Sequence, residues 1–423
     1  MQDSSKSLIA TSFGHLANDG LLSVFPILYP ILLLHAYSFT ATSIGVIGGA
    51  LNLFSIVTSP FIGRRSDVGR NFVRLMIVGV AILSLGVAGF ALALGYFHGT
   101  DLFLVLILFA SLAGFGSSSY HPIGAAVLNE QWGRKNRGRA LGINGSIGSV
   151  GTLGFPIIAV ALIGAFGTSS VVLLSGAGFA IAALIYSLMR RVRFRSVPDA
   201  SNDASMKSNL DLSQSSTPHS LGHMRESTVP LRIVIPPILA LTIYSFIRSI
   251  FAQSVNQFLP IYLNSVNHVQ YGYVALAASV VPAMGAISQP LVGQLADRYG
   301  RRLILAISSI GGFLAILLFI YSSNIFVGEV FLGILGMFQF TAFPLILGLS
   351  NEISSKGAKT FSSSIVWGLG VLGGGVVGPI IFGILTEPAF LGSLSSAFLA
   401  ITFIGLVAVV FVPFIPKPIA VRG

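Results

Sequence analysis

Long apolar stretches alternate with short polar connections along the whole chain. Each stretch holds about the twenty apolar residues that an α-helix needs to cross the hydrocarbon core of a bilayer. The twelve candidates are residues 8–34, 41–62, 72–97, 102–128, 139–165, 168–189, 233–263, 271–293, 303–322, 325–350, 361–386 and 392–414. None shows the alternation over about ten residues that marks a membrane β-strand. The pattern therefore predicts an all-α membrane protein with twelve transmembrane helices.

Composition agrees with this prediction, and the positions of the charges orient the chain. Of the 423 residues, 54% are hydrophobic and only 9% are charged, whereas soluble domains carry about 25% charged residues. Lys and Arg gather after the second, fourth, sixth, eighth and tenth stretches, and the alternate connections carry none. Because basic loops stay on the cytoplasmic side, we expect a cell-membrane protein with both termini in the cytoplasm. The net charge of +11 then faces anionic lipid headgroups rather than nucleic acid.

A hydrophilic segment divides the chain into two halves. Residues 196–229 are rich in Ser, Asn, Asp and Pro and predict a flexible linker between six-helix bundles at 1–195 and 230–423. Four residues of the fourth stretch recur in the tenth at one constant offset, in the pairs Gly114/Gly336, Pro122/Pro344, Asn129/Asn351 and Glu130/Glu352. Two parallel repeats imply pseudo-symmetric bundles with a substrate site between them and access that alternates by rocking.

Several kinds of chemistry are not indicated. The chain has no Cys, which excludes disulfides and thiolate metal sites. His219 and His223 lie four residues apart in the linker, where a solvated linker is a more common interpretation than a metal site. No nucleotide-binding loop occurs, which argues against an ATP-driven pump. We expect no metal, no other cofactor and a monomer.

The first apolar stretch carries polar residues at membrane depth, namely His15, Asn18 and Asp19. An ionisable group there costs about 2.5–3.5 kcal/mol or more, so such groups usually face a cavity or pathway. His15 and Asp19 are four residues apart and share one face of a helix. The pattern favours a site that handles protons or substrate. The alternative is a buried carboxylate that ties two helices together.

The connection after the eighth stretch resembles the signature loop of the major facilitator superfamily. It reads Gly293-Gln-Leu-Ala-Asp297-Arg298-Tyr-Gly300-Arg301. The copy in the first half, Gly63-Arg-Arg-Ser-Asp67-Val-Gly-Arg70, is one residue shorter between Asp and Gly. The resemblance implies that the Gly, Asp and Arg residues numbered here form a cytoplasmic latch that stabilises one access state.

A narrower resemblance is to the fosmidomycin-resistance group of that superfamily, whose members are drug exporters. It rests on His15-Leu-Ala-Asn18-Asp19 and on the run that ends in His121-Pro122, although Ile123 stands where that group has an acidic residue. The fifth and eleventh stretches are rich in Gly and contain Pro, which allows close helix packing and bending. The packing candidates are Gly148, Gly151, Pro156, Gly374, Gly378 and Pro379.

In the superfamily that the chain resembles, the first, fourth and seventh spans line a central cavity. The resemblance therefore implies that Asp19, His15 and His121 meet there and carry the coupling proton. Arg248 is the basic residue deep within a span, and it is the candidate anion or counter-charge site; the alternative is a buried pair with Asp19. The remaining substrate-binding candidates are polar residues of spans one, seven and ten: Asn18, Gln253, Asn256, Gln257 and Gln339.

These patterns together predict a secondary active transporter that is not an enzyme. The favoured function is a proton-coupled exporter, or antiporter, of a small organic compound or drug. A proton symporter or facilitator that imports an organic anion is the first alternative. A membrane-embedded enzyme is the second, because His15, Asp19 and His121 could form a hydrolytic set.

Overall fold

The structure is a computed structural model, and it describes residues 2–33, 37, 39–69, 72–132, 137–192, 231–354, 362 and 365–416. The first half contains α1 (Asp3–Leu32), α2 (Ala41–Gly69), α3 (Phe72–Tyr96), α4 (Gly99–Ser117), α5 (Tyr120–Gln131), α6 (Arg137–Phe166), the 3-10 helix η1 (Thr168–Val171) and α7 (Val172–Met189). The second half contains α9 (Leu231–Ser265), α10 (Tyr271–Tyr299), α11 (Arg301–Ile320), α12 (Ile325–Ile353), the π-helix η2 (Val366–Leu372), α14 (Gly373–Leu385), α15 (Leu394–Phe411) and the 3-10 helix η3 (Val412–Phe414).

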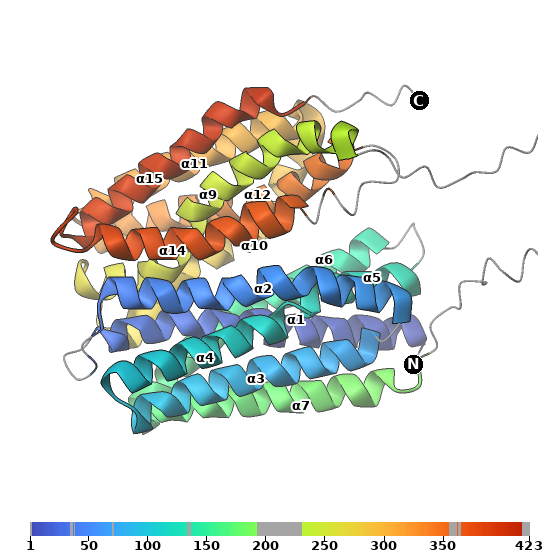
Figure 1. Ribbon diagram of the computed structural model, residues 1–423, viewed down its shortest axis with the longest axis horizontal. Coiled ribbons are helices and arrows are strands. Elements are labelled where there is room, and N and C mark those ends of the chain that lie inside the picture. The colour runs from blue at the N-terminus through green and yellow to red at the C-terminus, as the bar shows by residue number, and fades with distance from the viewer. Residues whose placement is uncertain are drawn as a thin grey trace, which may run out of the picture.

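The predicted all-α architecture with twelve helical passes is confirmed. Ten helical segments of the described chain are long and apolar enough to cross a membrane. The helix α1 and the apolar part of α2, Ala41–Ile56, complete the set. Figure 1 shows two bundles lying along each other, α1–α7 in one and α9–α15 in the other. The predicted linker, residues 196–229, lies outside the described residues.

The structure corrects the fourth predicted span, which is two helices rather than one. The helix α4 ends at Ser117 and α5 begins at Tyr120. Pro122 has no N–H, so the carbonyl of Ser118 has no helical donor four residues on. The Ser118 hydroxyl donates to the carbonyl of Phe115 at 2.6 Å, and the Ser119 hydroxyl donates to that of Gly116 at 2.8 Å. This break sets the positions of Tyr120 and His121 at the start of α5.

The bundles touch along α2 and α14, with further contacts between α6 and α10 and between α1 and α9. Figure 1 shows α2 and α14 side by side. Three side-chain hydrogen bonds of the described residues join the bundles: Thr42 Oγ1 to Glu387 Oε1 at 2.7 Å, Asn52 Nδ2 to the Gly375 carbonyl at 3.2 Å, and Tyr271 Oη to the Ile27 carbonyl at 2.9 Å.

Glycines make this close contact feasible. A Cβ atom at Gly45 would overlap the backbone carbonyl of Pro379, and one at Gly48 would overlap the side-chain amide of Gln257. Helices in a membrane gain little from hydrophobic burial against each other, so small residues that let two backbones approach determine where they pack. The inter-bundle contact therefore depends on the glycine face of α2.

We predict that Gly45→Leu weakens the contact between α2 and α14. Overpacking of this kind costs about 1–3 kcal/mol, which is about a fivefold or larger change in a two-state equilibrium. Because the chain has no Cys, the pair Thr42→Cys and Glu387→Cys reports on this contact through a short bifunctional thiol reagent. We expect the cross-linking yield to fall several-fold in Gly45→Leu. The control is Gly164→Leu, where a Cβ meets nothing within 4 Å; equal yields in the two variants would contradict the prediction.

Candidate functional site

His15, Asp19 and His121 meet inside the first bundle, although His121 is on a different helix from the other two. His15 Nε2 lies 3.0 Å from Asp19 Oδ2, and His121 Nε2 lies 3.6 Å from Asp19 Oδ1. The side chains are 15%, 27% and 49% exposed in the order His15, Asp19, His121. The cluster is therefore graded from a mostly enclosed imidazole to a half-exposed one. A proton or a substrate group can reach the carboxylate from the side of His121.

Asn18 completes the surroundings of the carboxylate. Its Nδ2 donates to Asp19 Oδ1 at 2.9 Å, and its side chain is buried. Each oxygen of Asp19 therefore has a neighbour: His15 at Oδ2, and Asn18 with His121 at Oδ1. A buried polar group is costly unless it is hydrogen-bonded, so these contacts are what makes a carboxylate tolerable at this depth.

Tyr120 and Asn144 hold the other side of His15. The rings of His15 and Tyr120 are stacked with centroids 4.9 Å apart. His15 Nδ1 lies 2.9 Å from the backbone carbonyl oxygen of Asn144 and 3.0 Å from its Oδ1. The Tyr120 hydroxyl donates to the carbonyl of Thr11 at 2.7 Å. The imidazole is therefore fixed by three helices: α1, α5 and α6.

The glycines of α6 let that helix approach α1 at the site. A Cβ at Gly148 would lie 2.6 Å from the ring of His15, and one at Gly151 would overlap the Leu16 carbonyl. Pro156 lies inside the same helix, α6. In the second bundle, a Cβ at Gly374 would overlap the Phe246 carbonyl. Gly378 faces the Ile250 carbonyl in the same way. All four predicted packing glycines therefore lie at helix contacts.

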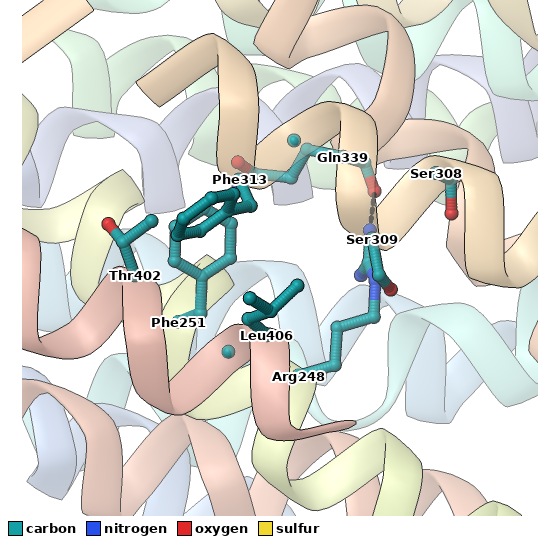
Figure 2. A pocket seen from close by; sticks show the side chains of 10 residues that line it. Arg248, Phe251, Ser308, Ser309, Phe313, Gln339, Thr402 and Leu406 are labelled. Atoms are coloured by element: carbon teal, nitrogen blue, oxygen red, sulfur yellow. Dashed lines mark hydrogen bonds between the residues drawn. The ribbon is translucent and has the colours of Figure 1, made fainter. Parts of the chain in front are cut away.

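Arg248 lies in a different place from the Asp19 cluster. Figure 2 shows it in a pocket of the second bundle, with its guanidinium directed toward Gln339 and Ser309. Its Nη2 donates to the carbonyls of Phe338 and Gln339, at 3.2 Å in each case. Within the described part of the chain no ion pair joins Arg248 to Asp19. The expected convergence of Arg248 with Asp19 and the two histidines on one site is therefore not found in this conformation.

The Arg248 pocket is small and only partly polar. Phe251 and Phe313 form an apolar wall, and Ser308, Ser309 and Thr402 are the hydroxyl residues that line it. The cavity has a volume of about 10 Å³, roughly the space of one water molecule. Arg248 Nε is buried and has no hydrogen-bond partner among the described groups. In this conformation the pocket is too small for an organic substrate, and the guanidinium is a buried positive charge.

The three amide residues of α9 that the sequence predicts for substrate binding contact three different helices. Gln339 Nε2 donates to Asn256 Oδ1 at 2.7 Å and so links α12 to α9. Gln257 faces Gly48 of α2, and Gln253 lies against Gly375 of α14. Gln253, Asn256 and Gln257 therefore lie on the sides of α9 that face other helices, with Gln257 at the contact between the bundles.

The predicted latch is helical over most of its length. The helix α2 continues to Gly69, so Gly63 and Asp67 belong to the helix, while Arg70 lies outside the described residues. In the second copy, Gly293 and Asp297 lie in α10. The Gly and Asp positions of both copies are therefore in helices rather than in loops, and the turn between α10 and α11 is a single residue, Gly300, with a φ of 89° that favours glycine. The latch role of these residues stays a prediction.

Basic residues flank that turn, and one of them, Arg301, reaches a neighbouring helix. Arg301 Nε pairs with Glu352 Oε1 of α12 at 2.8 Å. The Arg298 guanidinium lies over the ring of Tyr299 at 5.2 Å from its centroid. Arg301 therefore ties the start of α11 to the end of α12, next to Gly348, where a Cβ would overlap the guanidinium.

Asn144 was not identified from the sequence as a site residue, and neither was the role of Tyr120 in holding His15. Asn144 is a lone amide in the Gly-rich fifth stretch, and a polar residue in an apolar helix usually bonds across to a neighbour. That signal could have marked it as a candidate. Its partner could not have been chosen, because the partner depends on how α6 rotates against α1.

Comparison with known proteins places the chain in a family. The profile of the Major Facilitator Superfamily matches residues 11–367 and 241–422. The chain belongs to the Major Facilitator Superfamily and is a multi-pass membrane transporter of small molecules, not an enzyme.

One curated relative and several solved structures are similar along nearly the whole chain. The relative is an uncharacterized MFS-type transporter, YfnC, from Bacillus subtilis (strain 168), which is 26% identical over 405 residues, covering 95% of this chain and 91% of the relative. A bacterial homologue of the human lysosomal transporter Spinster, in an inward-facing and occupied conformation, has a TM-score of 0.74 at 14% identity, with 96% of each chain covered. A D-xylose-proton symporter has a TM-score of 0.75 at 13% identity, covering 98% of this chain and 99% of the other. The two structures bear on the fold alone.

We predict that Gly148→Ala displaces the His15 ring and destabilises the first bundle. The added methyl group would meet the ring at 2.6 Å, and overpacking a tight contact costs about 1–3 kcal/mol. Thermal unfolding in detergent checks this. Gly145→Ala, one turn away on the same helix and with nothing within 4 Å of its Cβ, is the matched control. A Gly148→Ala protein as stable as the Gly145→Ala protein would show that the ring moves aside without cost.

Proposed function

We propose that the protein is a proton-coupled exporter of a small organic compound, with Asp19 as the proton-coupling carboxylate. The observation that carries this proposal is the cluster of Asp19 with His15 and His121, at membrane depth in α1 and partly exposed. Ionisable groups within transmembrane segments mark proton and substrate pathways. Histidine changes charge in the physiological pH range, so all three groups of the cluster can take part in proton exchange.

The proposed cycle uses alternating access. Transporters of this architecture rock one bundle against the other around a site between them. The contact between α2 and α14 is the part of the described structure that would separate. We propose that the basic connections face the cytoplasm, that both termini lie there, and that the protein works as a monomer in the cell membrane. Export, rather than import, follows from the resemblance of the His-Leu-Ala-Asn-Asp and His-Pro motifs to the fosmidomycin-resistance group.

A second function is favoured by Arg248. A buried guanidinium without a carboxylate partner is expensive and would be stabilised by an anion. On this basis the protein would be a symporter or facilitator that carries an organic anion inward. Arg248 would then bind the anion or act as its counter-charge after the surrounding pocket opens, and Asn256, Gln257 and Gln339 would supply hydrogen bonds to the substrate.

We predict that Asp19→Asn abolishes proton movement that depends on substrate. Amide replaces carboxylate with nearly the same shape but binds no proton in this pH range. The protein is reconstituted in liposomes with an internal pH dye, a proton gradient is imposed, and a panel of phosphonates and lipophilic drugs is added. We expect a compound to collapse the gradient with wild type and not with Asp19→Asn. Asp101→Asn, at the exposed N-terminal turn of α4, is the control that should behave as wild type.

The direction of coupled movement separates the two functions. Protons that move against the substrate support the exporter, and protons that move with an anionic substrate support the symporter. If a compound crosses equally well with wild type and Asp19→Asn and moves no protons, Asp19 is structural and the proposal fails.

A further inference from the structure

Hydrogen-bond geometry around His15 determines where its protons lie. The backbone carbonyl oxygen of Asn144 lies 2.9 Å from His15 Nδ1. A carbonyl oxygen accepts and cannot donate, so Nδ1 must carry the hydrogen of this bond. This holds for both charge states of the ring, since imidazolium and one of the two neutral tautomers have a hydrogen at Nδ1.

Tyr120 turns the side chain of Asn144 so that it supports the same assignment. The single hydrogen of the Tyr120 hydroxyl is directed at the Thr11 carbonyl at 2.7 Å, which is shorter than its 3.3 Å distance to Asn144 Oδ1. The hydroxyl oxygen therefore accepts from Asn144 Nδ2 at 2.9 Å. The amide then presents Oδ1 to His15 Nδ1 at 3.0 Å, which gives Nδ1–H a second acceptor.

Fixing Nδ1–H has a consequence at the opposite nitrogen. His15 Nε2 lies 3.0 Å from Asp19 Oδ2. In a neutral ring with hydrogen on Nδ1, Nε2 has only a lone pair, and an ionised carboxylate also has only lone pairs. Two acceptors do not hold each other at this distance. The contact therefore needs one more proton, either on Nε2 of an imidazolium or on the carboxyl group of Asp19.

We propose that His15 and Asp19 bind the coupling proton as one unit, with one proton per pair, and that Asn144 and Tyr120 are positioning residues that keep His15 in the Nδ1–H form. This inference rests on the proposed role of Asp19. Loss of the proton would leave Nε2 and the carboxylate as mutual acceptors, so the pair would separate. The carboxylate would then be free to turn toward His121, the exposed side of the cluster. The described conformation is thus the protonated one.

Among the side chains that the structure describes, few other ionisable groups face this pair. His121 and Tyr120 are the ionisable groups that α5 contributes, and α6 contributes the amide and carbonyl of Asn144. The helix α9 also packs against α1. Its basic residue Arg248, however, has its described hydrogen bonds within the second bundle. The proton is therefore expected to respond to His15, Asp19 and His121 rather than to a distant cation.

The test is nitrogen NMR on the full-length protein with ¹⁵N-labelled histidine, reconstituted in lipid nanodiscs. The chain has seven His residues, and the His15 signals are assigned by their loss in His15→Gln. We expect Nδ1 to remain protonated across pH 5–9 and Nε2 alone to titrate. In Asp19→Asn the ring should become a neutral Nδ1–H tautomer, because the introduced side-chain amide donates to Nε2. A wild-type ring protonated on Nε2 and bare at Nδ1 would overturn the inference.

Asn144→Leu tests the positioning part. It removes the side-chain acceptor, so we expect a detectable share of the Nε2–H tautomer and a pH profile of proton-driven transport that moves to lower pH by about one unit, because the protonated ring has lost one of its acceptors. Asn52→Leu, a buried amide at the contact between the bundles, is the control and should leave the His15 signals unchanged. Unchanged signals and an unchanged pH profile in Asn144→Leu would remove the Asn144 side chain from the positioning role and leave its backbone carbonyl, which the variant keeps, as the acceptor for Nδ1–H.

The two proposals can fail separately. If Asp19→Asn abolishes proton movement but His15 has no hydrogen on Nδ1, the proton site is Asp19 without the pair. If His15 has the expected tautomer but Asp19→Asn still moves protons, the inference of a shared coupling proton fails together with the proposed function.

Discussion

A polar group buried at membrane depth is costly unless it finds a partner within the protein, because lipid offers none. The carboxylate of Asp19 shows how strongly this requirement shapes the first bundle. It needs His15 from the same helix and His121 from α5, and His15 in turn needs Asn144 from α6. These contacts require α6 to approach α1 closely, which the glycines at 148 and 151 permit. The break between α4 and α5 brings Tyr120 and His121 to the same point. Helix packing and site chemistry are therefore two aspects of one arrangement.

Glycines lie both at helix contacts within each bundle and at the contact between the two bundles. Gly148 and Gly151 of α6 in the first bundle lie at contacts with α1, and Gly374 and Gly378 of α14 in the second lie at contacts with α9. Gly45 and Gly48 of α2 instead face the opposite bundle. In the proposed cycle this contact opens, and a close fit that relies on small residues opens more readily than one made of deeply interdigitated side chains. The few hydrogen bonds across this contact, such as that from Thr42 to Glu387, are compatible with repeated separation.

The sequence was sufficient for the membrane spans and for the core of the site. Spacing of four residues on a helix placed His15 beside Asp19, and membrane depth made both notable. It was not sufficient for Arg248. That residue is at a similar depth, but depth does not determine which way a helix face points, and α9 turns Arg248 toward α11, α12 and α15. Asn144 was missed for a related reason: its role depends on the rotation of α6. Local periodicity predicts which residues share a face, whereas tertiary packing decides what that face meets.

The single-residue turn at Gly300 has a mechanical consequence. Because this glycine ends α10 and also begins α11, the two helices have no slack between them. The helix α10 touches α6 of the other bundle, and α11 is tied to α12 through Arg301 and Glu352. A tilt of α10 against the first bundle must therefore carry α11 and the end of α12 with it. These three helices of the second bundle would then move together rather than independently of one another.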